Sequence, residues 1–107
     1  MRLFRIEDKE RRGPYRPGFS ALWADAEGPP PPPPWAREFG ICILAQVQPG
    51  ENMQCGFRTE TQLHRWFTTA EIYRLQLLGY QIVEAEATRI IAESKHQVVF
   101  IRAEITP

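Results

Sequence analysis

Cysteine and histidine are the side chains of this 107-residue chain best suited to nucleophilic, basic or metal-binding chemistry, and each occurs twice. Cys42 and Cys55 form no CxxC motif, and His64 and His96 lie too far apart for metal-ligand spacing. Cys42 stands within an apolar run, where burial keeps a thiol protonated and inert. Cys55 precedes a glycine and is the more accessible in principle, yet no histidine lies in register to activate it. The spacing predicts two buried, reduced thiols rather than a disulfide, and no metal centre.

Motifs that identify nucleotide-binding proteins and hydrolases by their spacing do not occur in the chain. It contains no P-loop and no GxGxxG, GxSxG or HExxH sequence. Glu84 and Glu86 share one face of an expected strand, and exposure to solvent explains them without an acid–base role. Trp66 and Tyr73 follow helical spacing, which predicts that they belong to the core rather than to a binding platform. The residues alone define no complete catalytic set.

Composition limits the classes of protein to which the chain can belong. Hydrophobic residues make up 43% of it, enough for one modest core, so a single domain over residues 1–107 is expected. Thirteen basic residues balance thirteen acidic ones, which argues against nucleic-acid binding through bulk charge. Residues 1–20 hold six basic and three acidic side chains, whereas residues 21–60 hold two and five. This polarity could orient a partner, or could be ordinary solvated surface.

The N-terminal sequence lacks the features of an export signal. Charged residues interrupt it at once, whereas a signal peptide needs a sustained apolar stretch after its basic start. The longest uncharged apolar run, residues 39–47, is far shorter than the ~20 residues that cross a bilayer. The protein is therefore expected to be soluble and cytoplasmic, without a membrane partner.

The expected strands lie near both ends of the chain and in a short central stretch. Each is an alternating or continuous apolar run bounded by turn residues. They are predicted at residues 3–6, 40–47, 53–57, 80–87 and 97–105. Residues 88–95 could continue extended structure or form a turn.

Two consecutive helices are predicted after the third of these strands. Thr59 with Gln62 and Thr68 with Glu71 each give a capping-box pattern, which satisfies free backbone N–H groups at a helix start. An apolar stripe runs through both helices, and Gly79 suits the position just after the second. The fold class is therefore α+β: a single domain with a mostly antiparallel sheet, two consecutive helices on one face and a polyproline II segment.

The polyproline II segment follows from six consecutive prolines, Pro29 to Pro34, because proline fixes φ and lacks the N–H donor. One helical turn over residues 21–26, capped by Ser20, is expected before it. The proline run could dock into an aromatic-lined groove of a partner, or could be a stiff connection across the domain surface. Acidic residues flank the tryptophan that follows it, and the candidate partner-binding patch is Asp25, Glu27, Trp35 and Glu38.

Five short motifs resemble a family of small proteins from bacteriophages and prophages. They are Arg5 with Glu7, Gly13-Pro14-Tyr15, Cys55-Gly56-Phe57 with Gln62-Leu63 and Trp66-Phe67, Gly79-Tyr80-Gln81-Ile82-Val83, and Gln97-Val98-Val99-Phe100. The resemblance implies a phage-borne accessory protein, a class that includes inhibitors of host defence such as anti-CRISPR proteins. It points to non-catalytic binding of a host protein or protein complex in the host bacterial cytoplasm, without a cofactor. A small virion or morphogenesis component is an alternative.

A second resemblance is to small ADP-ribosyltransferase-like domains. These open with a strand bearing an Arg or His that holds NAD, place an aromatic residue shortly after it, and end with a strand that carries a catalytic acid. Arg5, Tyr15 and the late strand from His96 have a similar order, with Gln97 where such enzymes usually place Glu. A neutral amide cannot stabilise the positive charge that develops as the nicotinamide bond breaks. The resemblance implies an NAD-dependent alternative that uses Arg5, Tyr15 and Gln97, whereas the residues alone favour a surface ion pair for Arg5.

Overall fold

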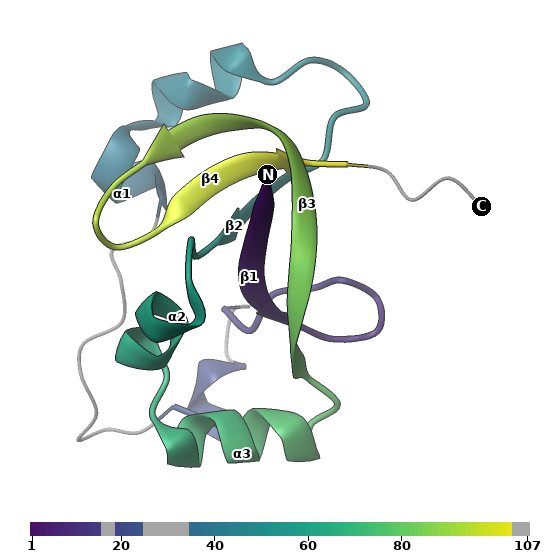
Figure 1. The fold of residues 1–107 in the computed structure, drawn as a ribbon, viewed down its shortest axis with the longest axis vertical. Helices are drawn as coiled ribbons and strands as arrows, with labels where there is room; N and C mark the ends of the chain where they lie inside the picture. The colour runs from purple at the N-terminus through teal and green to yellow at the C-terminus, as the bar shows by residue number, and fades with distance from the viewer. Residues whose placement is uncertain (16–18, 25–34, 104–107) are drawn as a thin grey trace.

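The computed structural model of the chain describes residues 1–15, 19–24 and 35–103. They form a curled, four-stranded antiparallel sheet with helices packed against its outer surfaces (Figure 1). The strands are β1 (Arg2–Glu7), β2 (Met53–Gly56), β3 (Gln81–Glu93) and β4 (Val98–Arg102). The helices are α1 (Trp35–Phe39), α2 (Glu60–Trp66) and α3 (Thr69–Leu77), with the 3-10 helices η1 (Ser20–Leu22) and η2 (Ile41–Gln46). The predicted α+β class is confirmed.

Strand β3 joins the two halves of the sheet because it is long enough to pair with two strands in succession. Its first half pairs with β1 and its second half with β4 (Figure 1). Register shifts within residues 87–92 mark bulges, which bend a strand and increase its twist. The order β1-β3-β4-β2 curls until its two ends meet, where Phe4 and Phe57 exchange both backbone hydrogen bonds at 2.8 and 2.7 Å. The curl therefore has an inside and an outside.

Apolar side chains form three clusters around this sheet. The cluster inside the curl consists of Leu3, Ala85, Ala87, Val98 and Phe100. The helix-side cluster consists of Ile6, Trp23, Phe57, Leu63, Phe67, Ile72, Leu75 and Tyr80. The third, beneath η2, consists of Ile43, Ile91, Val99 and Ile101. Leu63 and Leu75 are fully enclosed, and residues 98–100 lie in the ladders of β4, so the predicted packing of both helices on the sheet is confirmed.

Both helices begin where the hydroxyl pattern predicts. The Thr68 hydroxyl accepts from the Glu71 N–H at 3.1 Å, and the Glu71 carboxylate accepts from the Thr68 N–H at 2.9 Å, which completes a capping box. The Thr59 hydroxyl accepts from the Gln62 N–H at 3.1 Å. The Gln62 side chain instead reaches the N–H of Arg58, at 3.1 Å, so only half of that box forms.

Substituting Thr68→Ala is expected to lower the free energy of unfolding by about 1 kcal/mol, because it removes the hydroxyl that accepts from the Glu71 N–H at the start of α3. Chemical denaturation measures the change. The matched control is Thr69→Ala, one residue further along the same helix and exposed, with an expected change within about 0.5 kcal/mol. Equal losses for the two variants would contradict a specific role for the cap.

Residues 41–46 form the 3-10 helix η2, so the prediction of a buried strand over residues 40–47 is wrong. Gly40 enters the segment with φ 84°, in the left-handed region that favours glycine. Only Ile43 of the helix is buried, whereas Ile41 is 67% exposed. A short apolar run has no periodicity that separates strand from helix. In the folded chain β4 is already paired on both edges, by β2 and β3, which leaves it no edge for a further strand.

The two thiols differ in exposure in the reverse of the expected order. Both cysteines are free, but Cys42 is exposed on η2 while Cys55 lies partly buried on β2. Burial raises the pKa of Cys55 to about 11, against a smaller opposing effect from the positive charge of Arg5. The expectation of a buried Cys42 is wrong because the segment that carries it is a surface helical turn.

A thiol-directed reagent at pH 8 is expected to modify Cys42 quickly and Cys55 slowly. With a pKa of about 11, only about one Cys55 thiol in a thousand is ionised at that pH, and the thiolate is the reactive form. Absorbance traces of the released chromophore resolve the two rates. The Cys42→Ser variant is expected to lose the fast phase, and a fast phase that persists in it would contradict the assignment.

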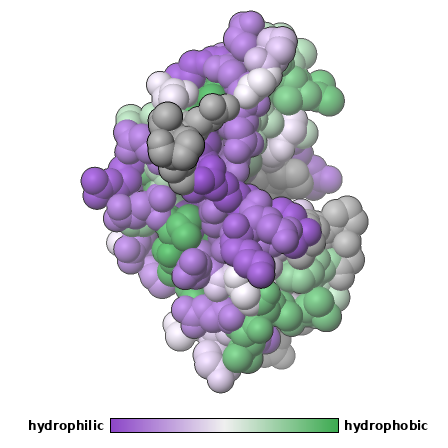
Figure 2. All heavy atoms as spheres, turned by 90° about the vertical axis from the view of Figure 1, so that its right-hand side faces the viewer, coloured by the Kyte–Doolittle hydropathy of each residue, from purple (hydrophilic) through white to green (hydrophobic). Residues whose placement is uncertain are grey.

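Exposed apolar side chains gather at two ends of the molecule, with a polar band between them (Figure 2). Ile41 and Leu44 belong to η2, and Tyr73 and Leu77 belong to α3. Tyr73 is 61% exposed, so its predicted place in the core is wrong. An α-helix turns by about 100° per residue, and α3 directs Ile72 and Leu75 inward, which leaves Tyr73 facing outward.

The structure also changes the type or the bounds of other predicted elements. The expected turn after Ser20 is the 3-10 helix η1, and the ambiguous residues 88–93 continue β3. The proline run Pro29–Pro34 and the end of the last predicted strand, residues 104–105, lie outside the described residues. Within the described ranges, no helix has the length and apolar character required to span a membrane.

Candidate functional site

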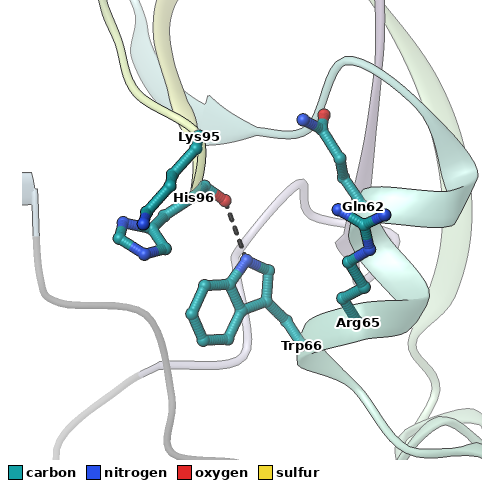
Figure 3. Close-up of a pocket in the computed structure, with 5 residues that line it drawn as sticks. All are labelled: Gln62, Arg65, Trp66, Lys95 and His96. Atoms are coloured by element: carbon teal, nitrogen blue, oxygen red, sulfur yellow. Dashed lines mark hydrogen bonds between the residues drawn. The ribbon is translucent and has the colours of Figure 1, made fainter.

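A pocket of about 250 Å³ lies between α2 and the turn that joins β3 to β4 (Figure 3). It is lined by Gln62, Arg65, Trp66, Lys95 and His96, which we call the Trp66 pocket. Lys95 and His96 project from the turn on one side, and Gln62 and Arg65 rise from α2 on the other, with the indole of Trp66 between them (Figure 3). The fold thus brings two short, distant stretches of the sequence to one place.

The indole of Trp66 is held in a fixed position. Its Nε1–H donates to the backbone oxygen of His96 at 2.8 Å, the bond drawn in Figure 3. The Trp66 and His96 rings lie 5.5 Å apart between centroids, tilted by 57°. Trp66 also packs against the helix-side cluster and is partly buried, as the helical spacing predicts. Its only N–H donor is thereby used, and the ring has a defined orientation towards the pocket.

A carboxylate from α1 anchors the other wall of the pocket. Glu38 lies 2.6 Å from His96 Nδ1 through Oε2, and its Oε1 accepts from Gln97 Nε2 at 3.0 Å. Burial alone would raise the pKa of Glu38, but hydrogen bonds from His96, Gln97 and Ser94, together with the charge of His96, lower it below its ordinary value. Glu38 is therefore ionised at neutral pH and ties the hairpin turn to α1.

The predicted partner-binding patch is only partly described by the structure. Trp35 packs against the cluster beneath η2, and the Glu38 side chain is 12% exposed. Both side chains thus hold α1 against the sheet and the hairpin turn. Asp25 and Glu27 lie outside the described residues. A partner-binding role for these four residues remains a prediction.

The residues proposed for NAD chemistry have three separate sets of neighbours. Arg5 is buried and pairs with Glu7 at 2.9 Å. The Tyr15 ring lies against aromatic side chains of the helix-side cluster, at centroid distances of 5.3 and 6.0 Å. Gln97 is buried and donates to Glu38. Arg5, Tyr15 and Gln97 follow one another in the order that the resemblance requires, but within the described residues we observe no contact among them.

Arg5 belongs to a buried polar cluster at one end of the curl, so the prediction of a surface ion pair is wrong in its location. Glu7 accepts from Arg5 Nε and from Arg102 Nη1, and Arg102 also donates to the Gln54 side chain at 3.1 Å. Arg5 further donates to the backbone oxygen of Cys55 at 2.7 Å. Burial lowers the pKa of Arg5, and the charge and hydrogen bond of Glu7 oppose this effect. The cluster links β1, β2 and β4, and its contacts are those of a structural element.

The Trp66 pocket presents cations and donors rather than acceptors. Neither Arg65 nor Lys95 forms an ion pair with a carboxylate in the part of the chain that the structure describes. The Gln62 side-chain oxygen is occupied by the Arg58 N–H, which leaves its amide nitrogen as a donor. The arrangement suits an anionic group next to an aromatic ring.

Sequence reasoning missed this pocket because no local signal joins its two walls. Trp66 was expected only in the core, and Arg65 and Lys95 stand in no motif. Their only common sequence feature is position, since each precedes a lining aromatic or imidazole residue. Among residues 1–15, 19–24 and 35–103, no group of three or more His, Cys, Asp and Glu side chains is placed to hold a metal ion.

Comparison with known proteins gives the chain a family. A family model described as Bacteriophage T4 Y00F protein matches residues 1–107. No curated protein and no solved structure matches the chain. The predicted resemblance to phage proteins is confirmed at this level. Because the match extends over the whole sequence, the chain belongs to the Bacteriophage T4 Y00F protein family.

Proposed function

We propose that this phage protein is a non-catalytic accessory protein that binds a host macromolecule through the face around the Trp66 pocket, in the setting of inhibition of host defence. The observation that carries the proposal is the pair of cations, Arg65 and Lys95, which form no ion pair within the described residues and lie beside an indole in a fixed position. Membership of a phage protein family supports the setting. Unpaired charges beside an aromatic ring are typical of surfaces that recognise a partner.

The types of side chain in the pocket favour binding over covalent catalysis. The five lining residues supply two cations, an amide, an indole and an imidazole, but no hydroxyl, thiol or carboxylate. Covalent catalysis needs an activated nucleophile, and among the lining side chains only the imidazole of His96 and the amine of Lys95 are nucleophiles. Lys95 is exposed, and Nδ1 of His96 already lies 2.6 Å from the Glu38 carboxylate. Binding is the activity that these groups support.

The pocket is also organised before any partner arrives. The bond from Trp66 to the His96 backbone fixes one wall, and the contacts of Glu38 with the hairpin turn fix the other. Ordering side chains on association costs about 0.5–1.5 kcal/mol for each flexible side chain. Because the aromatic and imidazole groups are already held, that cost falls mainly on Arg65 and Lys95.

Charge reversal at the pocket tests the proposal. Tagged protein is expected to retain a specific partner from a host lysate, and Arg65→Glu is expected to weaken that retention at least about fivefold. The matched control is Lys9→Glu, which makes the same change of charge at an exposed lysine outside the pocket. Mass spectrometry quantifies the partner, and plating of phage on hosts with and without each defence system tests the setting. Equal retention by the two variants would remove the pocket from the proposal.

The same retention assay distinguishes the Trp66 pocket from the partner-binding patch that the sequence predicts. If Trp35 and Glu38 contact the partner, Trp35→Ala combined with Glu38→Lys weakens retention. The contacts of Glu38 with His96 and Gln97 mean that this double variant also lowers the melting temperature. Arg65→Glu leaves the melting temperature unchanged, since Arg65 is exposed.

The enzyme alternative is an NAD-dependent ADP-ribosyltransferase that uses Arg5, Tyr15 and Gln97. Each side-chain nitrogen of Arg5 already donates a hydrogen bond, to Glu7 or to the backbone oxygens of residues 11 and 55. Labelled NAD incubated with the protein and host lysate tests it: no label on any protein and no thermal shift with NAD reject the enzyme. A role in the virion is tested by purifying intact particles and probing them for the protein.

A further inference from the structure

We infer that the Trp66 pocket binds a nucleoside phosphate, with the base stacked on the indole and the phosphate held between Arg65 and Lys95. The inference deepens the proposed function, because it uses the same pocket and names the chemistry that the pocket recognises. It rests on three observations: the character of the lining charges, the state of the indole, and the size of the pocket.

The positive charges that line the pocket favour an anionic ligand. Arg65 rises from α2 and Lys95 descends from the hairpin turn, so the two cations enter from opposite sides (Figure 3). Among the described residues, no carboxylate lines the pocket and no ion pair neutralises either cation. The side-chain amide nitrogen of Gln62 adds a neutral donor on the same side as Arg65. A phosphate offers several acceptor oxygens and suits donors that belong to different elements.

The indole of Trp66 favours a ligand with a planar ring. Its one N–H is bonded to the His96 backbone, and the indole lines the pocket beside the His96 ring, whose centroid lies 5.5 Å away, so the aromatic surface that remains towards the pocket has no N–H donor to offer. Every nucleobase has a π-face, and stacking on an aromatic side chain beside cations is the general mode by which proteins hold unpaired nucleotides. An acidic peptide would use the cations but would leave the indole without a planar partner.

The size of the pocket is compatible with a ligand of about one nucleotide. Its volume of about 250 Å³ lies below the roughly 300–1,000 Å³ typical of sites that enclose drug-sized ligands. One base and its phosphate can therefore contact the five lining residues while the sugar remains towards solvent. The nucleoside phosphate could be free or could be an unpaired nucleotide of a single strand. Balanced net charge is compatible with either source, because a single-nucleotide pocket needs only local cations.

Titration calorimetry on the full chain tests the inference with five probes: AMP, adenosine, inorganic phosphate, a short oligoadenylate and a short oligoglutamate peptide. AMP or the oligoadenylate is expected to bind at least about tenfold more tightly than adenosine or phosphate, because only they use both halves of the pocket. AMP binding assigns the free nucleotide, and binding of the oligoadenylate alone assigns the single strand. Phosphate or oligoglutamate binding as tightly as both nucleotide probes would overturn the inference, and so would the absence of binding by either nucleotide probe.

Variants separate the two halves of the pocket. Arg65→Glu and Lys95→Glu change exposed residues and are each expected to weaken nucleotide binding at least about tenfold, whereas Lys9→Glu leaves it unchanged. Trp66→Leu is expected to lose the preference for AMP over phosphate, and Trp66→Phe to keep most of it. Because Trp66 contacts the core, the melting temperature is measured for both, and the two charge variants keep the test decisive if Trp66→Leu does not fold.

The outcomes for the ligand and for the function are distinguishable. If nucleotides bind and Arg65→Glu abolishes that binding, but the variant still retains the same host partner, the ligand inference stands and the proposed function fails. If Arg65→Glu loses the host partner while no nucleotide probe binds the unaltered chain, the proposed function stands and the ligand inference is overturned.

Discussion

Replacing Glu7 with glutamine is expected to lower the free energy of unfolding by about 3–5 kcal/mol, the range for removing one partner from a buried ion pair. Glu7 is the carboxylate between Arg5 and Arg102, and all three side chains are less than one-tenth exposed. Glutamine preserves the volume and removes the negative charge. Two buried guanidinium groups would then lie close together without a counter-charge, and desolvation already lowers the pKa of Arg5.

The matched control for this experiment is Glu84→Gln, which removes the same charge from an exposed pair. Glu84 lies 3.3 Å from Arg2, and both side chains are more than half exposed. Such surface pairs contribute about 0–1 kcal/mol. Urea denaturation of the two variants at neutral pH measures the difference. A loss at Glu7 no larger than the loss at Glu84 would show that the cluster is not the electrostatic link between β1, β2 and β4.

A methyl group at Gly56 is expected to lower the free energy of unfolding by about 2–3 kcal/mol, through overpacking at the point where the sheet closes. A Cβ on Gly56 would lie 2.8 Å from the backbone oxygen of Phe4 and 3.2 Å from the ring of Phe100. The Phe4 oxygen accepts the backbone bond from Phe57, so it cannot move away without breaking the contact between β1 and β2.

Gly13→Ala is the control for Gly56→Ala. Its Cβ would meet Arg5 Nη2 at 3.6 Å, which is ordinary van der Waals contact. A change within about 0.5 kcal/mol is expected there. Hydrogen exchange adds a local measurement, since the amides of Phe4 and Phe57 are expected to exchange faster in Gly56→Ala than in Gly13→Ala. Unchanged exchange and stability in Gly56→Ala would contradict the tight closure of the curl.

The elements that could be predicted from the sequence are those whose signals lie within a few residues. Alternation located β1, and the pairs Thr59–Gln62 and Thr68–Glu71 located the starts of both helices. Gly79, with φ 89°, marked the end of the second helix. Each signal acts through backbone hydrogen bonds or sterics near the residue itself, so distant parts of the chain do not alter it.

Errors arose where a local pattern fits two structures. The apolar run at residues 40–47 suits a buried strand or a helical turn equally well, because a short apolar run has no periodicity that separates the two. Cys42 and Tyr73 were misplaced for related reasons. The direction of each side chain depends on which face of its segment the rest of the fold covers, and that face is not encoded by the residue alone.

The Trp66 pocket and the buried Arg5 cluster have a different origin. Each joins residues from separate parts of the chain, with Trp66 thirty positions before His96 and Arg102 ninety-five positions after Glu7. The Arg5-x-Glu7 spacing places both side chains on one face of β1 and was a usable local signal for half of the cluster. No local signal marked Arg102, Arg65 or Lys95 as members of a site.

By itself, the sequence determined the α+β class, the capped helices and the resemblance to phage proteins that the family match confirms. Those conclusions follow from short-range periodicity, from capping and from recognisable motifs. Only the tertiary structure decided that the sheet curls until β1 meets β2, that Arg5 is buried, and that α2 faces the hairpin turn. The physical reason is that packing and charge pairing depend on which distant segments become neighbours, and the chain settles this only when the whole sheet closes.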